Sequence, residues 1–216
     1  MTNDKSHFIS LEGGEAAGKS TQIERLAERL EKLGHRVIVT REPGGTQLGE
    51  TIRHLLKYAP EGRGMTDEAE LLLFLASRAE LVRKVIAPAL DQGAWVLSDR
   101  FLDSTTVYQG LGRKLPPEVV ERVNAFAVGT SLPGLTLVLD LEPEEARRRL
   151  QKRTQSGEEI FDRMEAETTD FFARVRQGYH NLAQAHPHRV KIISAGGTMD
   201  ETAAAIWEEV SRTFNI

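Results

Sequence analysis

The feature that most constrains this chain is a glycine-rich segment between a short apolar run and an amphipathic one. Residues 13–20 read GGEAAGKS, which matches the P-loop pattern G-x-x-x-x-G-K-[ST]. Residues 7–11 before it are typical of a short strand, and residues 21–33 after it repeat apolar side chains at helical spacing. A strand, a glycine turn and a helix in this order direct backbone N–H groups and a helix N-terminus at one phosphate. The segment therefore predicts a phosphate-binding loop on an α/β scaffold.

The motif itself indicates which of its residues bind a nucleotide and a metal ion. Lys19 is expected to reach the β- and γ-phosphates, and the Ser20 hydroxyl to ligate Mg²⁺. The other contacts come from the backbone of the loop and of the first helical turn. The predicted ATP-binding residues are Gly13, Gly14, Glu15, Ala16, Ala17, Gly18, Lys19, Ser20 and Thr21.

Strand-like and helix-like segments alternate along the rest of the chain. Short runs rich in Val, Ile and Leu predict strands covered on both faces at residues 8–11, 36–40, 94–98, 135–140 and 189–193. Helical periodicity occupies residues 66–90, 119–128, 143–153, 168–184 and 199–214. We therefore expect one domain over residues 1–216 with an α/β, three-layer P-loop NTPase fold, in which helices flank a five-stranded parallel sheet. The polar stretch 153–167 predicts a short mobile lid, which we delimit at about 150–167.

Composition narrows the classes of partner. The net charge is −4 with both signs interspersed, which argues against a nucleic-acid-binding surface. The absence of cysteine excludes disulfides, thiol nucleophiles and cysteine zinc sites, and the six histidines indicate no metal site. Residues 1–6 show no apolar signal region, and the longest apolar run is 71–76, so we expect a cytoplasmic chain without a membrane partner.

A P-loop alone does not separate motors, GTPases and kinases, so other residues must do so. No N-K-x-D string for guanine occurs, and the chain is short for a large ATPase. Arg41 and Arg100 follow predicted strands, while Arg53 and Arg78 lie on the helices beyond. Strand ends gather around the ligand crevice of such a sheet, and guanidinium groups bind phosphate bidentately. A second phosphate site, and hence a small kinase, is favoured.

Two aspartates end predicted strands and compete for the metal ion. Asp99 ends the run at 94–98, and Asp140 ends the run at 135–140. Either carboxylate could bind Mg²⁺ directly or through water. Spacing does not separate them, but the adjoining Arg100 favours Asp99 because the pair offers a metal ligand and a phosphate donor together.

Several segments in order resemble the thymidylate kinases of bacteria over nearly the whole chain. They are T-R-E-P-G-G at 40–45, L-F-L-A-S-R at 73–78 and D-R-F-x-x-S-x-x-x-Y-Q-G at 99–110, behind the P-loop. The resemblance implies transfer of the γ-phosphoryl group of Mg·ATP to dTMP, giving dTDP for dTTP biosynthesis, by a homodimer. The residues also leave open another P-loop nucleoside monophosphate or deoxynucleoside kinase, or a non-catalytic nucleotide-binding module.

The resemblance also implies a set of substrate-binding side chains, namely Glu42, Arg53, Phe74, Arg78, Arg100, Ser104, Tyr108 and Gln109. Phe74 would stack on thymine, and Arg78 would hydrogen-bond the base with Ser104 and Gln109 nearby. Tyr108 would pack against the deoxyribose. Pattern alone would make Phe74 a core residue and Tyr108 a helix-packing residue.

Charged residues receive catalytic roles from the same resemblance. Arg53 and Arg100 would hold the acceptor phosphate, and Glu15 would face its 3′-hydroxyl. No arginine lies between the P-loop glycines, so the lid is expected to supply one. The expected catalytic residues are Lys19, Glu15 and Arg100, with Arg163 as the first lid candidate and Arg153 as the second.

Residues 147–149 are expected to form a solvated helix face, and residues 194–198 either a purine-side loop or a simple turn. An attacking phosphate oxygen is already ionised, so no general base is expected.

Overall fold

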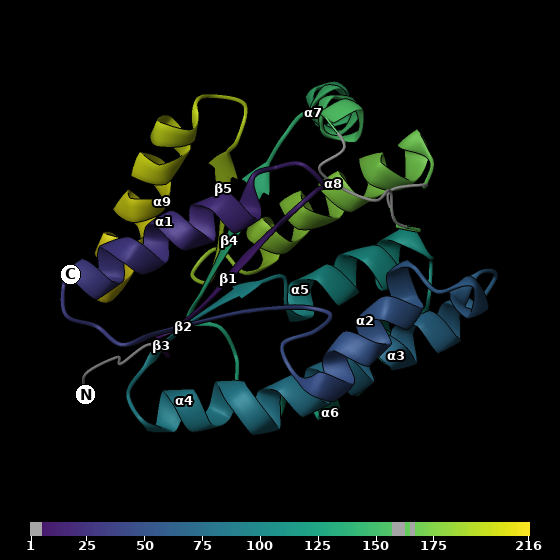
Figure 1. The fold of residues 1–216 in the computed structure, drawn as a ribbon, viewed down its shortest axis with the longest axis horizontal. Coiled ribbons are helices and arrows are strands. Elements are labelled where there is room, and N and C mark those ends of the chain that lie inside the picture. Colours follow the sequence, from purple (N-terminus) through teal and green to yellow (C-terminus); the bar gives the residue numbers. More distant parts are fainter. Residues whose placement is uncertain (1–5, 157–162, 165–166) are drawn as a thin grey trace.

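The computed structural model describes residues 6–156, 163–164 and 167–216, and the side chains of residues 153–156 fall outside the described set. Its centre is one parallel sheet with the strand order β2-β3-β1-β4-β5 (Figure 1). The strands are β1 Phe8–Gly13, β2 Val37–Arg41, β3 Trp95–Asp99, β4 Leu135–Asp140 and β5 Val190–Ser194. All five predicted strands are therefore confirmed, with ends displaced by at most two residues.

Helices fill the connections between the strands. They are α1 Lys19–Lys32, α2 Gln47–Lys57, η1 Pro60–Gly62, α3 Asp67–Leu81, η2 Val82–Ile86, α4 Ala87–Asp91, α5 Leu102–Thr105, η3 Thr106–Gly112, α6 Pro117–Val128, α7 Pro143–Ser156, α8 Thr169–Ala185 and α9 Met199–Phe214. Of these, η1 is a 3₁₀ helix and η2 and η3 are π-helices. The predicted helix at 66–90 is confirmed as the continuous run α3–η2–α4, which contains a π-helical turn directly before the segment with Pro88.

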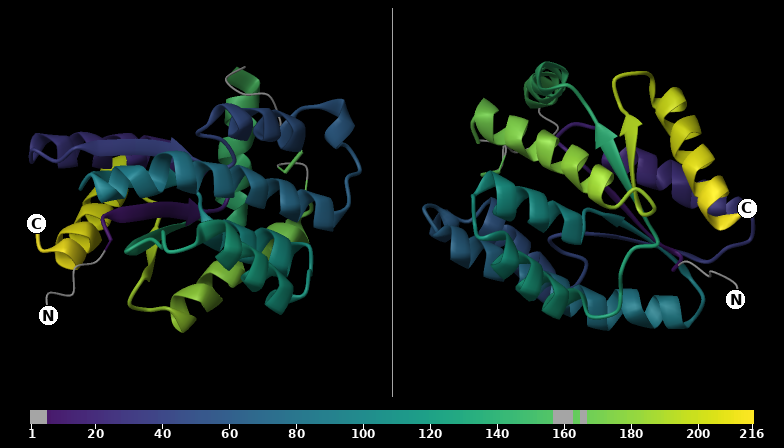
Figure 2. Two further views of the ribbon diagram at one scale, coloured as in Figure 1. Left: turned by 90° about the horizontal axis from the view of Figure 1, so that it is seen from below. Right: turned by 180° about the vertical axis from the view of Figure 1, so that it is seen from behind.

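The side chains of the strands alternate between two cores, one on each face of the sheet. Ile9, Leu11 and Leu97 are buried with apolar residues of α1 and α9. Phe8 and Val96 lie in a second cluster, with apolar residues of α3, η2 and α4. Figure 1 and the reverse view in Figure 2 show α1 and α9 together on one side of the sheet and α3, α4, α6 and α8 on the other. Ala146 of α7 packs against the cluster on the α1 and α9 side. This arrangement confirms the predicted three-layer α/β fold.

Two segments differ from the sequence expectation. The helical run α5–η3 over Leu102–Gly112 was not predicted as a separate element, because Thr and Gly are weak helix formers. Helix α7 continues to Ser156, so the first part of the stretch expected to be a lid loop is helical. Residues 157–162 and 165–166 of that stretch lie outside the described residues. No helix among the described residues is long and apolar enough to cross a membrane.

Candidate active site

The predicted strand–turn–helix geometry is present around the P-loop. Gly13 ends β1 with φ +123°, and a Cβ there would lie 2.3 Å from the Leu139 carbonyl oxygen of β4. Only glycine therefore allows β1 to pass β4 this closely while turning into the loop. Gly18 is the N-cap of α1 and is left-handed, with φ 86°. The first N–H groups of α1 consequently open onto the loop, as an anion-binding helix start requires.

Lys19 lies almost buried beneath this loop, with 7% of its surface exposed. Its Nζ donates to the Gly14 carbonyl at 2.7 Å. Burial and the neighbouring Arg100 lower the pKa of Lys19, although Glu15 and Asp99 oppose this shift. Burial disfavours the charged form, so an anion arriving in the loop would stabilise the ammonium group.

The two candidate metal aspartates have different neighbours. The Ser20 hydroxyl donates to Asp99 Oδ2 at 2.9 Å. Asp140 instead accepts from Arg176 Nε and Nη2 at 2.8 and 2.9 Å, and lies 3.3 Å from His180 Nε2. The hydrogen bond from Arg176 is the main cause that lowers the pKa of Asp140. Of the two, Asp99 is the carboxylate that meets the P-loop.

The oxygen atoms of Ser20 and Asp99 suit Mg²⁺, which prefers oxygen ligands. Within the described ranges, no group of three or more His, Cys, Asp or Glu side chains is arranged to hold a metal ion. That agrees with Mg²⁺, because this ion commonly uses one or two protein ligands and completes its shell with substrate phosphates and water. The donor set therefore fits the expected cofactor.

One cavity of about 750 Å³ connects the P-loop with α2, α3 and the α5–η3 run. The end that borders the P-loop is called the donor end below, because a phosphoryl donor would lie there, and its lining residues are Glu15, Ala16, Ala17, Gly18, Lys19, Ser20 and Thr21. The opposite end is called the acceptor end, because the phosphoryl acceptor would lie there, and its lining residues are Glu42, Arg53, Phe74, Arg78, Arg100, Ser104, Tyr108 and Gln109. All side chains that the sequence assigned to substrate binding thus line the same space as the phosphate-binding loop.

Arg100 lies between the two ends. Its backbone is left-handed, with φ 71°, directly after β3. Its Nη2 donates to Glu15 Oε1 at 2.6 Å, and its Nη1 donates to the Gly13 carbonyl at 3.0 Å and to the Ser104 hydroxyl at 3.2 Å. The guanidinium also lies 4.9 Å from the centre of the Tyr108 ring. It thereby places a permanent positive charge between the two ends of the cavity.

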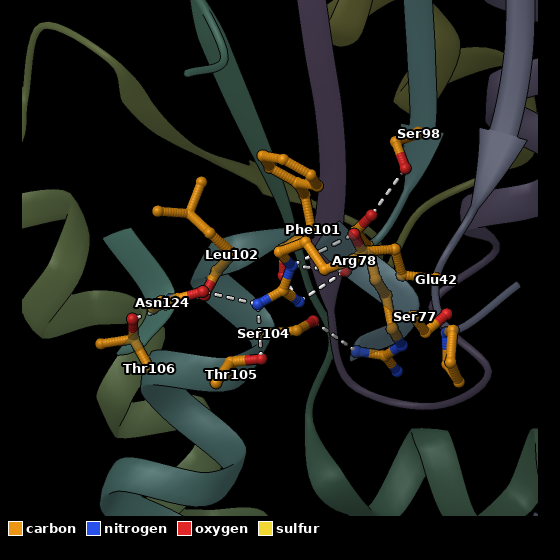
Figure 3. A network of polar contacts seen from close by, with 12 residues as sticks. Glu42, Ser77, Arg78, Ser98, Phe101, Leu102, Ser104, Thr105, Thr106 and Asn124 are labelled. Atoms are coloured by element: carbon orange, nitrogen blue, oxygen red, sulfur yellow. Dashed lines mark hydrogen bonds and ion pairs between the residues drawn. The ribbon is translucent and has the colours of Figure 1, made fainter. Parts of the chain in front are cut away.

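Arg78 is fully buried, and all five of its N–H groups donate to protein acceptors (Figure 3). Nε and Nη2 donate to the Glu42 carboxylate at 2.8 and 2.5 Å. Nη1 donates to Thr105 Oγ1 at 2.9 Å and to Asn124 Oδ1 at 2.6 Å, and Nη2 also reaches the Phe101 carbonyl at 3.1 Å. A hydrogen bond from Arg78 to a base would therefore share a donor that is already used.

The remaining acceptor-side residues line the cavity with fewer contacts. Phe74 is half-buried, and Arg53 Nη1 donates to the Pro43 carbonyl at 3.0 Å. The Tyr108 hydroxyl is buried and has no hydrogen-bond partner among the described residues. Gln109 is almost fully buried, and its Nε2 donates to Glu70 Oε1 at 2.8 Å. Apolar ring faces and polar groups thus share this end of the cavity.

The structure describes the side chain of only one of the two predicted lid arginines, Arg163. Arg163 Nε donates to the Leu56 carbonyl at 3.0 Å and its Nη2 to Glu70 Oε2 at 2.6 Å, and this residue is not part of the cavity lining. The Arg153 side chain lies outside the described set. Arg149 and Lys152 of α7 do line the cavity, so the expected solvated face is correct for residues 147–148 and wrong for Arg149. Arg149 and Lys152 are three residues apart and so lie on the same face of α7, and this spacing is the sequence signal that could have placed both at the cavity.

Arg149 and the loop after β5 complete the donor end. Arg149 Nη2 donates to the Ala195 carbonyl at 3.1 Å, and its Nε donates to Glu145 at 3.0 Å. Ala195 and Gly197 line the cavity. The segment 194–198, left open as a purine-side loop or a turn, therefore borders the same space as the P-loop.

Comparison with known proteins gives one consistent result. The thymidylate kinase family model matches residues 11–206. The chain is 46% identical to the thymidylate kinase of Syntrophotalea carbinolica, covering 98% of both chains, and 48% identical to that of Nitratidesulfovibrio vulgaris, covering 95% and 94%. It also resembles the crystal structure of thymidylate kinase from Ehrlichia chaffeensis, with a TM-score of 0.75 and 31% identity over 94% of this chain and 97% of that one. This chain therefore belongs to the thymidylate kinase family.

Proposed function

We propose that the chain transfers the γ-phosphoryl group of Mg·ATP to the 5′-phosphate of dTMP, giving ADP and dTDP in dTTP biosynthesis. One observation carries this proposal: a single cavity holds the P-loop at one end and every predicted acceptor-binding side chain at the other, with Arg100 between them. The family membership supports the same reaction. The whole chain acts as one kinase domain in the cytoplasm, with its lid within about 150–167.

At the donor end, the backbone of residues 13–18 and the start of α1 bind the phosphates of ATP, and Lys19 approaches the β- and γ-phosphates. Ser20 and Asp99 would hold Mg²⁺, which supplies neutralisation of the charge on the phosphate oxygens. Arg149 and Lys152 add positive charge from α7. A role for Arg163 or Arg153 in turnover stays a prediction.

At the acceptor end, Arg53 and Arg100 hold the phosphate of dTMP, and Glu15 faces its 3′-hydroxyl. Phe74 stacks on thymine and Tyr108 packs against the sugar, with Ser104 and Gln109 beside the base. The saturated contacts of Arg78 indicate that it chiefly fixes Glu42 and Thr105 in the wall of this compartment.

The chemistry requires positioning and charge neutralisation rather than a general base. The attacking phosphate oxygen is ionised at neutral pH, so no proton has to be removed from it. Arg100 and Lys19 lie where two phosphates would be brought together and would reduce their repulsion. Exclusion of water from this space favours transfer to dTMP over hydrolysis.

The chain acts as a homodimer in this proposal. Helices α3 and α6 pack against each other, and apolar side chains on them remain exposed: Leu72 is 59% exposed, Val119 47% and Phe126 82%. Large exposed apolar side chains on packed neighbouring helices are the feature that supports an interface here. Sedimentation or light scattering of the wild-type chain and of Phe126→Glu tests both parts of this assignment. A monomeric wild type would contradict the homodimer, and a dimeric variant would contradict an interface that includes Phe126.

The reaction is tested by ADP release from Mg·ATP with dTMP, dUMP, ribosyl-TMP, dCMP, dGMP, AMP or no acceptor. We expect strong stimulation by dTMP and weaker or no stimulation by dUMP. Preference for another monophosphate would keep the phosphoryl transfer and overturn the base-site assignment. Tight ATP binding without stimulation by any acceptor would overturn the proposed reaction.

A further inference from the structure

Two polar contacts link α3 to the α5–η3 run at the acceptor end. Arg78 of α3 donates to Thr105 Oγ1 at 2.9 Å, and Gln109 of η3 donates to Glu70 Oε1 at 2.8 Å. Residues 70, 74 and 78 follow one another at intervals of four on α3, so they lie along one side of that helix. Phe74, the proposed stacking residue, is therefore placed between the two contacts, and Gln109 borders the same cavity.

Glu70 is a buried carboxylate whose acceptor capacity is fully used. It is 1% exposed. Its Oε1 accepts from Gln109 Nε2 at 2.8 Å and Arg113 Nε at 3.1 Å, and its Oε2 accepts from Arg113 Nη2 at 3.1 Å and Arg163 Nη2 at 2.6 Å. A carboxylate has about four lone-pair sites, and each one here meets an N–H donor. Burial would raise the pKa of Glu70, but the hydrogen bonds from Arg113 and Gln109 outweigh it and keep the group ionised.

An ionised carboxylate can only accept hydrogen bonds, and this determines how the Gln109 amide is turned. The NH₂ group of Gln109 must face Glu70, so the carbonyl oxygen Oε1 is directed away from Glu70 and is the acceptor that this cavity-lining residue can offer. A carboxamide in other surroundings can present either its oxygen or its nitrogen. Here the orientation of the Gln109 amide is set by Glu70, which is not part of the cavity lining.

We propose that Glu70 is a positioning residue that fixes the Gln109 amide so that an acceptor oxygen faces the nucleobase. The inference rests on the proposed function and concerns selection among acceptor bases. Thymine and uracil carry an N–H at N3 and can donate to this oxygen, whereas cytosine carries a bare lone pair at N3. Two acceptors facing each other repel and leave Oε1 unsatisfied, which disfavours dCMP.

The test measures dissociation constants of dTMP, dUMP and dCMP by calorimetry for the wild-type chain and Glu70→Gln. A glutamine at position 70 can donate or accept, so the Gln109 amide loses its fixed orientation. We expect dTMP and dUMP to weaken together and dCMP not to weaken, so that the dTMP-to-dCMP preference falls about tenfold. Asp67→Asn is the matched control, because Asp67 also pairs with Arg113, at 3.6 Å, without being a partner of Gln109. The dTMP-to-dCMP preference of Asp67→Asn should equal that of the wild type.

The outcomes separate a positioning role from a structural one. Equal weakening of all three nucleotides in Glu70→Gln, or an unchanged preference, would overturn the proposal. Gln109→Leu keeps Glu70 with its two arginines and removes the acceptor, so it should lose the same preference even where Glu70→Gln does not fold. An unchanged preference in Gln109→Leu would also overturn the proposal. A wild-type chain without preference for dTMP over dCMP would instead mark a failure of the proposed function, and with it of this inference.

Discussion

The donor and acceptor ends of the cavity are held in place by different kinds of contact. At the donor end, residues 13–20 form one continuous loop and helix start, and Lys19 is fixed by the Gly14 carbonyl nearby in sequence. At the acceptor end, side chains distant in sequence fix one another: Arg78 contacts Glu42 and Asn124, which are 36 and 46 residues away. A local motif therefore builds the first end, whereas the second exists only once α3, η3 and α6 have packed.

The largest expected effect is on kcat and comes from Lys19→Ala, which alters the donor end only. Lys19→Ala should lower kcat by about 10³-fold, because a preorganised charge at the transferred phosphate is lost. The affinity for dTMP, measured by calorimetry, should stay near the wild-type value. Lys32→Ala on the exposed side of the same helix is the control and should change neither quantity. A parallel loss of dTMP affinity in Lys19→Ala would show that the ends are not independent.

Arg78→Met tests whether the side-chain contacts of the acceptor end stabilise the fold. The substitution leaves the Glu42 carboxylate buried without its partner, which costs about 3–5 kcal/mol of unfolding free energy. Urea denaturation measures this, and Arg41→Met serves as a control because its pair with Glu50 is exposed. Adding Glu42→Gln should restore part of the stability. A stable Arg78→Met variant that has lost only dTMP affinity would contradict the structural role.

Glu12 of β1, directly before the P-loop, gives the unfolding free energy a pH dependence. It is fully buried, and burial together with the charge of Asp103 raises its pKa from 4.5 to about 7. Because the folded pKa is raised, its stabilisation is complete below pH 4.5 and is lost as the pH rises through about 7. From pH 5 to pH 8 the wild-type chain should lose up to about 3 kcal/mol of unfolding free energy through this group.

Glu12→Gln should flatten this pH dependence, because the amide does not titrate. Its amide oxygen can accept from the Phe101 N–H, as Glu12 Oε1 does at 2.7 Å, and its NH₂ group can donate to the Tyr179 hydroxyl, which lies 3.0 Å from Glu12 Oε2. Urea unfolding of both proteins at pH 5 and pH 8 provides the measurement. Equal slopes for the two proteins would remove Glu12 as the cause.

The smallest effects concern the arginines near the lid. Arg149→Ala should lower kcat about tenfold because Arg149 borders the donor end, whereas Arg163→Ala should change kcat less. The exposed Arg148→Ala is the neighbouring control. A larger fall in Arg163→Ala, with dTMP affinity unchanged, would instead support the expectation drawn from the sequence.

The features that could be predicted from the sequence are mostly those built by a local motif, as at the donor end. The P-loop and the strands are local patterns, so their positions were predicted within two residues. The contrast between Asp99 and Asp140 depends on Arg176, a residue on α8 that spacing along the chain does not connect with either. The saturation of Arg78 likewise depends on three separate elements. The positions of Arg53, Arg78 and Arg100 relative to the predicted strands already indicated a second phosphate site. Phe74 and Tyr108 were found only through the family resemblance, because pattern alone favoured packing roles for both.

The position of a transferred phosphate tests the central claim most directly. The chain is incubated with dTMP and Mg·ATP labelled at the γ-phosphate, and the products are separated. The account predicts that the label appears in the β-phosphate of dTDP, since both nucleotides occupy one cavity around Arg100. Label found only in inorganic phosphate, or retained in ATP, would contradict it.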